Sequence, residues 1–209
     1  MSGRRRSSPR LSPELRYGLA EEAARLMAEH GIRDFAQAKR KAAERLGVRA
    51  GDGSLPSNAE IHEQLVQRQR IFEPDTHSER LARLRRVAAD VMEMIALFRP
   101  KLVGPVLDGT ATVNTAVEIH AFSDSPEVVA AALASHGLHV RDSQRRYRFG
   151  GQGAELIPGF EFVIEGDELE VMVFPERASG HAPLSPVDGR PMRRAARSAV
   201  IALLAPVAS

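Results

Sequence analysis

Glu118 and His120 are the residues of this sequence best suited to chemistry, because a carboxylate and an imidazole can bind a metal ion or move a proton. They stand in a segment, Val117 to Phe122, that alternates apolar residues with others. Such alternation predicts a β-strand on which Glu118 and His120 share one face. The alternative is that both residues form the solvent-facing half of an ordinary strand.

The residues just before this strand are small enough to admit a ligand close to the backbone. Gly104, Gly109 and Thr110 lie between two predicted strands. Their backbone amides and the Thr110 hydroxyl could contact phosphate groups, and the alternative is a glycine-containing turn. Asp108, which precedes Gly109, is expected to form a turn and not to act as an acid.

In this stretch the sequence resembles the nucleotidyltransferase superfamily, which has the fold of DNA polymerase beta and of small bacterial nucleotidyltransferases. That family has a strand, a Gly-Ser turn, a Gly-Thr pair a few residues later, and then a strand bearing Asp-x-Asp. Gly104 stands at the glycine of the turn, with Pro105 in place of the serine. Gly109 and Thr110 match the Gly-Thr pair. The resemblance covers the middle of the chain.

The acidic motif departs from the family pattern. Aligned without gaps, Ala116 falls on the first aspartate and Glu118 on the second, and Thr115 takes the place of the serine before them. With a longer loop, Glu118 and His120 take the two acidic positions instead. Neither alignment supplies two carboxylates. The family carries a third acid on a later strand, and the resemblance assigns that position to Glu170.

The resemblance implies a protein that binds a nucleoside triphosphate with Mg²⁺ and can transfer a nucleotidyl group to a hydroxyl acceptor. Such transfer uses metal ions held by carboxylates. The implied catalytic residues are Glu118, His120 and Glu170, of which Glu118 and Glu170 would bind the metal. Because Mg²⁺ prefers oxygen ligands, His120 would be a weak ligand, a donor to phosphate or a proton acceptor. The resemblance implies nucleotide binding by Gly104, Gly109 and Thr110, and we add Arg146 and Arg148 as candidates because of their charge.

The two arginines in that set belong to a charged segment, Leu138 to Phe149, that is expected to be a strand. Arg145, Arg146 and Arg148 could neutralise phosphates there. The alternative is a solvated edge strand, because charged side chains are common at sheet edges.

Two further functions stay open. The chain could be a catalytically inactive descendant of the nucleotidyltransferase fold that serves nucleotide sensing or partner binding. It could also be a DNA-binding regulator, because two predicted N-terminal helices separated by a glycine turn loosely resemble a helix-turn-helix. The second of these helices carries Lys39, Arg40, Lys41 and Arg45, although a basic outer face on a packed helix pair explains the same residues.

The composition is that of a soluble globular protein. The chain has 209 residues, a net charge of +2, 27% charged residues and no cysteine, which excludes disulfides and thiolate metal sites. No apolar run approaches the roughly 20 residues that cross a bilayer, so we expect a cytoplasmic protein without a membrane partner. An arginine-rich tail at residues 1–10 is expected to be disordered, with weak nucleic-acid binding as the alternative.

The periodicity of apolar residues is helical as far as Pro100 and strand-like afterwards, which predicts an α+β fold. We expect a nucleotidyltransferase-like mixed sheet packed on helices, with an N-terminal helical segment and a C-terminal helix. The expected parts are a tail at 1–10, a helical segment at 11–74, an α/β core at 75–175 and an arm with a helix at 176–209. Four helix starts are indicated by capping residues: Ser12, Asp34, Ser57 with Glu60, and Thr76 with Glu79.

The segment Arg177 to Pro191 is rich in proline and glycine and precedes a predicted final helix, Met192 to Leu204. Three arginines, Arg190, Arg193 and Arg194, lie near the start of that helix. We predict that this arm folds over the open face of the sheet near Glu118.

Overall fold

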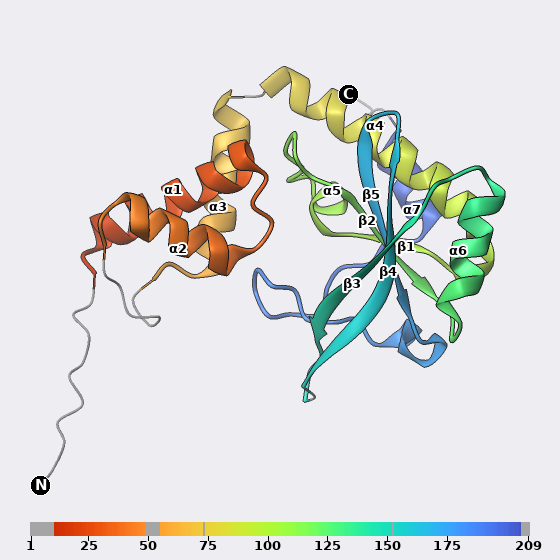
Figure 1. The fold of residues 1–209 in the computed structure, drawn as a ribbon. Helices are drawn as coiled ribbons and strands as arrows, with labels where there is room; N and C mark the ends of the chain where they lie inside the picture. The colour runs from red at the N-terminus through yellow and green to blue at the C-terminus, as the bar shows by residue number, and fades with distance from the viewer. Residues whose placement is uncertain (1–10, 49–54, 73, 152, 206–209) are drawn as a thin grey trace, which may run out of the picture. The chain divides into compact units, whose positions relative to one another are not determined.

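The computed structural model describes residues 11–48, 55–72, 74–151 and 153–205. The chain divides into two compact units, Met1–Glu73 and Pro74–Ser209, and each is described by itself (Figure 1). The expected basic tail at residues 1–10 lies outside the described residues. Within them, no helix is both long and apolar enough to cross a membrane.

The described residues of the N-terminal unit form three helices, α1 (Pro13–His30), α2 (Phe35–Arg45) and α3 (Asn58–Phe72). Their starts are those that the sequence predicts. The Ser12 side chain accepts a hydrogen bond from the Leu15 amide, and Asp34 caps α2 in the same way. The small buried face that joins the helices is largely alanine and leucine: Leu19, Ala20, Ala23, Ala24, Leu26, Ala38, Ala42, Ala43, Ile61 and Leu65.

The capping box at the start of α3 provides a direct test of this unit. The Ser57 hydroxyl accepts from the Glu60 amide, and the Glu60 carboxylate accepts from the Ser57 amide. Replacing Ser57 by alanine should therefore lower the free energy of unfolding of the N-terminal unit by about 1 kcal/mol, measured by urea unfolding. Ser57→Thr keeps a capping hydroxyl and should stay near the wild type. Equal stability of the two variants would contradict the prediction.

The second unit begins with a long helix, α4 (Pro74–Met94), followed by a short 3₁₀ turn, η1 (Ala96–Phe98). The predicted capping box of Thr76 with Glu79 is wrong, because α4 starts at Pro74 and Thr76 already lies inside it. The end of the helical stretch is as predicted. Arg99 takes a left-handed conformation with φ 48° immediately before Pro100, which disfavours a helical residue before it.

The sheet of this unit has five strands in the order β1-β2-β5-β4-β3. They are β1 (Lys101–Val103), β2 (Val117–Phe122), β3 (Arg141–Arg148), β4 (Ala154–Ile164) and β5 (Asp167–Phe174). Strands β2 and β5 run parallel, while β1 with β2, β4 with β5 and β3 with β4 are antiparallel. The expected α+β class with a mixed sheet is confirmed, as are the hairpin of β4 with β5 and the edge position of β3.

Two predicted elements differ from the structure. The predicted loop after β1 contains a short helix, α5 (Gly104–Asp108), which begins immediately after Val103 and ends at Gly109 with φ 82°. The predicted final helix is shorter, α7 (Arg197–Ala202), because Ala195 instead pairs with Leu102 of β1. Two hydrogen bonds of 2.9 Å join the backbones of Ala195 and Leu102.

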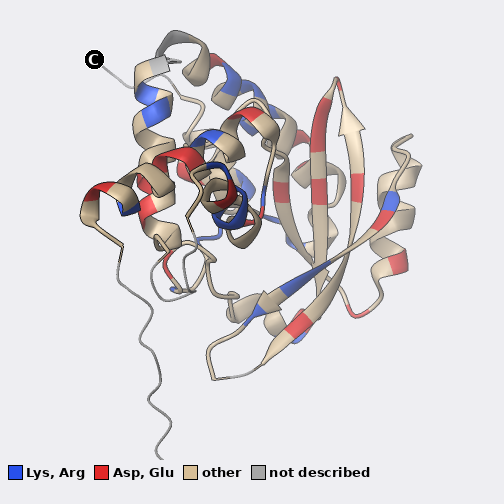
Figure 2. Ribbon diagram, turned by 60° about the vertical axis from the view of Figure 1, so that its left-hand side comes forward, with Lys and Arg blue, Asp and Glu red and all other residues tan. Residues whose placement is uncertain are grey.

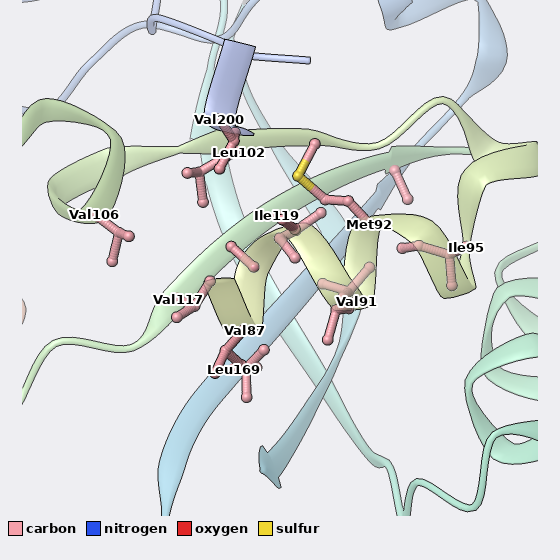
Figure 3. Packing of buried hydrophobic residues seen from close by; sticks show 14 of the residues in the cluster. Val87, Val91, Met92, Ile95, Leu102, Val106, Val117, Ile119, Leu169 and Val200 are labelled. Carbon is pink, nitrogen blue, oxygen red and sulfur yellow. The ribbon is translucent and has the colours of Figure 1, made fainter. Parts of the chain in front are cut away.

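One face of the sheet carries the main hydrophobic core. Helices α4, α6 (Pro126–Ser135) and α7 contribute apolar side chains that pack with this face. In Figure 3, Val91 and Ile95 of α4 belong to the same cluster of buried apolar side chains as Ile119 of β2 and Leu169 of β5. All four of these side chains are at most 1% exposed. The predicted alternation of Val117, Ile119 and Ala121 on one face of β2 is confirmed, and this is the helix-covered face.

The other face of the sheet is also covered. Five buried residues form what we call the second-face cluster: Phe122, Tyr147, Ile157, Met172 and Phe174. Residues 175–196, which we call the C-terminal arm and which include the turn η2 (Glu176–Gly180), pack there through Ala178 and Met192. Strands β2 and β5 are therefore buried on both faces. The interpretation of His120 as part of a solvent-facing half-strand is wrong, because the His120 side chain is 0% exposed.

Candidate functional site

Two carboxylates meet on the second face of the sheet. Glu118 of β2 and Glu170 of β5 are direct partners in the parallel register, so their side chains leave adjacent backbone positions on the same face. The side chain of Glu118 is 17% exposed and that of Glu170 is 4% exposed. The structure therefore brings together two of the three acidic or basic residues that the resemblance assigns to catalysis.

The guanidinium of Arg145 lies between these two carboxylates. Its Nη1 is 3.0 Å from Oε1 of Glu118, and its Nη2 donates to Oε2 of Glu170. Arg145 comes from edge strand β3, two strands away from β5 in the sheet order. Its side chain is 31% exposed, so the cluster is only partly open to solvent. Figure 2 shows acidic residues on several strands of the sheet and basic residues on β3.

The two carboxylates stabilise the charged form of Arg145. Burial alone would lower the pKa of this guanidinium, but the negative charge of Glu118 and that of Glu170 raise the pKa above its ordinary value. One fixed positive charge thus neutralises part of the repulsion between two adjacent carboxylates.

Gly104 completes this part of the site. It follows β1 directly, with φ 68°, a conformation that L-residues with a Cβ rarely adopt. A Cβ at this position would lie 3.2 Å from Oε2 of Glu118. The glycine therefore leaves room for the Glu118 carboxylate beside the backbone at the start of α5.

His120 lies deeper on the same face, among aromatic rings. Its ring is 4.4 Å from that of Phe174 and 5.5 Å from that of Tyr147, measured between centroids. Nε of Arg194, from the C-terminal arm, donates to Nδ1 of His120 at 3.2 Å. Burial, together with the positive charges of Arg194 and Arg145, lowers the pKa of His120 well below its ordinary value. The imidazole is therefore neutral at physiological pH.

The remaining predicted nucleotide-binding residues lie apart from the carboxylates. The carbonyl of Gly109 is 3.0 Å from Nε2 of His77 in α4, and the Thr110 amide donates to the carbonyl of Pro105. Arg146 and Arg148 alternate with Arg145 along β3 and so point to the opposite face of the sheet, where both are exposed.

The C-terminal arm lies on the second face, as predicted, and its Arg194 contacts His120, two residues along β2 from Glu118. Arg194 stacks over the rings of Phe122 and Phe174, with its Cζ 5.1 Å and 5.2 Å from their centroids. Its Nη1 also donates to the carbonyls of Ala178, Ser179 and His181. The neighbouring Arg193 pairs with Asp108 at 3.0 Å, so the predicted turn residue Asp108 anchors the arm to α5.

The residues present do not fit the pair of Mg²⁺ ions that nucleotidyl transfer requires. Ala116 stands where the gap-free alignment places the first acid, and Arg145 already occupies the space between Glu118 and Glu170. The buried imidazole of His120 is a poor ligand for Mg²⁺. Within the described residues, no group of three acidic, histidine or cysteine side chains is arranged to hold a metal ion.

In the N-terminal unit, some of the basic side chains that were considered for DNA binding form contacts within the unit. Arg45 pairs with Glu22 at 3.1 Å, and burial lowers the pKa of Lys39. Arg40 and Lys41 are exposed on α2. Both signs of charge alternate on these helices in Figure 2, which is typical of a solvated helix surface.

Comparisons with known proteins add little to this geometry. No protein-family model and no curated protein matches the chain. Among solved structures, a chain of the GLD-2/RNP-8 complex is similar over 56% of this chain, at 15% identity and a TM-score of 0.32. The match covers 48% of that chain, about half of its length. A TM-score this low carries no argument about fold or function.

Sequence reasoning missed the role of Arg145 in this site, although one signal was available. Arg145 and Tyr147 are two residues apart on β3, so their side chains point to the same face of the sheet. Tyr147 is the one large aromatic residue of that strand. The face that buries Tyr147 must also carry Arg145. Arg194 had no such local signal, because it lies 74 residues from His120 in the sequence.

Proposed function

We propose that the sheet unit is a non-catalytic binding module with a nucleotidyltransferase-like arrangement, in which the Arg145 guanidinium stands where a metal ion would be held. The observation that carries this proposal is the contact of one guanidinium with both Glu118 and Glu170. A fixed internal cation satisfies the acid pair without an exchangeable ion. It also cannot supply a metal-bound hydroxyl or hold a triphosphate as Mg²⁺ does.

The test compares the wild type with Arg145→Gln in thermal unfolding with and without millimolar Mg²⁺, alongside a nucleotidyl-transfer assay with labelled nucleoside triphosphates. We expect the melting temperature of the wild type to be independent of Mg²⁺, and no labelled product to form. Arg145→Gln removes the guanidinium that contacts both carboxylates, so a cation can take its place and Mg²⁺ should raise the melting temperature of this variant. A Mg²⁺-dependent product from the wild type would overturn the proposal.

Nucleotidyl transfer with Mg²⁺ and a nucleoside triphosphate is the second candidate, and one observation favours it. Glu118 and Glu170 lie in register on adjacent parallel strands, beside the positive-φ Gly104, as the resemblance implies for an acid pair next to a glycine turn. This candidate requires Arg145 to leave the carboxylates when substrate binds. The same transfer assay decides between the two, because this candidate predicts a product that disappears in Glu118→Gln.

A further inference from the structure

Three polar side chains surround the ring of Phe174 on the second face of the sheet. The His120 ring is 4.4 Å and the Tyr147 ring 5.1 Å from the Phe174 centroid, and Cζ of Arg194 is 5.2 Å from it. They come from β2, β3 and the C-terminal arm. Segments far apart in the sequence thus converge on one buried aromatic ring.

Each of these side chains carries a buried polar atom that lacks a hydrogen-bond partner among the described residues. The atoms are Nε2 of His120, the hydroxyl oxygen of Tyr147 and Nη2 of Arg194. A buried polar atom without a partner costs on the order of 1–3 kcal/mol, so three of them around one ring are unusual.

All three unpartnered groups are hydrogen-bond donors. Arginine can only donate, so the bond from Arg194 to Nδ1 of His120 makes Nδ1 an acceptor. The neutral imidazole must then carry its proton on Nε2, which donates. Burial raises the pKa of Tyr147, so its hydroxyl keeps its proton and can donate as well. The positive charges of Arg194 and Arg145 act on the ring of His120, while the carboxylates of Glu118 and Glu170 act on Tyr147.

We propose that His120, Tyr147 and Arg194 form a binding site for an oxyanion, the carboxylate or phosphate group of a ligand. Such a group supplies only acceptors, and its negative charge matches the guanidinium of Arg194. The inference deepens the proposed function by naming the ligand chemistry of the binding module.

The C-terminal arm would control access to this site. Arg194 belongs to the arm and is tied to it through the carbonyls of Ala178, Ser179 and His181. The three donor atoms are shielded from solvent. A ligand must therefore enter when the arm moves, and an anion bound to Arg194 would hold the arm on the sheet.

The experiment measures thermal unfolding and isothermal titration of the full chain with inorganic phosphate and, separately, with acetate. Ionic strength is kept constant with sodium chloride. The variant is Tyr147→Phe, which removes one hydroxyl, and the matched control is Tyr17→Phe, because Tyr17 is 55% exposed and lies in the N-terminal unit. The phosphate and acetate arms distinguish a phosphoryl ligand from a carboxylate ligand.

We expect at least one anion to raise the melting temperature of the wild type and of Tyr17→Phe in a saturable way. Tyr147→Phe should bind that anion about tenfold more weakly, because the variant loses the charge-assisted hydrogen bond from the Tyr147 hydroxyl to the anion. Without the anion, Tyr147→Phe should be at least as stable as the wild type, because it no longer buries an unpartnered hydroxyl. Saturating anion should also slow tryptic cleavage after the exposed Arg177 of the arm.

Two outcomes would overturn the proposal: neither anion acts differently from chloride, or Tyr147→Phe binds it as tightly as the wild type. If Tyr147→Phe does not fold, Arg194→Lys replaces it, since lysine keeps the charge but removes the Nη2 donor. These results are separable from the test of the proposed function, which depends on Mg²⁺, nucleotide transfer and Arg145.

Discussion

Replacing Arg145 by glutamine should lower the free energy of unfolding of the sheet unit by about 3 kcal/mol, among the largest effects expected of a single substitution in this chain. Glu118 and Glu170 would then face each other on adjacent strands without the cation that both contact. Removing one partner of a fully buried ion pair costs about 3–5 kcal/mol. The lower end applies here because Arg145 is 31% exposed and water can partly replace it.

Chemical denaturation of the wild type and the variant measures this effect. Arg146→Gln is the matched control, because Arg146 is exposed on the opposite face of the same strand and should change stability by less than about 0.5 kcal/mol. Equal stability of the two variants at neutral pH would contradict the ion-pair interpretation.

The second large effect is expected at Gly159, on β4 beside Met172 of β5. A Cβ at this position would lie 2.6 Å from Sδ of Met172 and 2.8 Å from the carbonyl oxygen of Val171. The thioether can move, but the carbonyl belongs to the backbone of β5 and is fixed by the sheet. Gly159→Ala should therefore lower the free energy of unfolding by about 2–3 kcal/mol.

Urea unfolding monitored by circular dichroism tests this prediction. Gly150→Ala is the control, because a Cβ there meets nothing within 4 Å and the change should be nearly neutral. Since Met172 belongs to the second-face cluster, Gly159→Ala should also disturb packing around Phe174. A stability within about 0.5 kcal/mol of the control would show that the strands can separate at little cost.

The local features of the fold were predictable from the sequence because their causes lie within a few residues. The caps at Ser12, Asp34 and Ser57 each depend on a hydrogen bond to a residue three positions away. The alternation of β2 fixed which residues share a face with Glu118. Thr76 failed as a cap because α4 begins at Pro74, which the capping pattern alone does not reveal.

The site was only half predictable, because its other half depends on long-range pairing. Glu118 and Glu170 came from the family resemblance, and the parallel register of β2 with β5 places them side by side. The position of Arg145 depends on the register of β3 with β4, and that of Arg194 on the path of the C-terminal arm. Such pairings are determined by contacts between segments far apart in the sequence, so no local sequence pattern predicts them.

The pairing of Ala195 with Leu102 covers the backbone groups at the free edge of β1. Strand β1 has three residues and forms an outer border of the sheet, and two backbone hydrogen bonds to Ala195 occupy that border. A chain shortened ahead of Ala195 would present unpaired amides and carbonyls there, a template on which a neighbouring molecule could add its own strand. Truncation ahead of Ala195 should thus promote self-association, which analytical ultracentrifugation would detect as a shift to larger species.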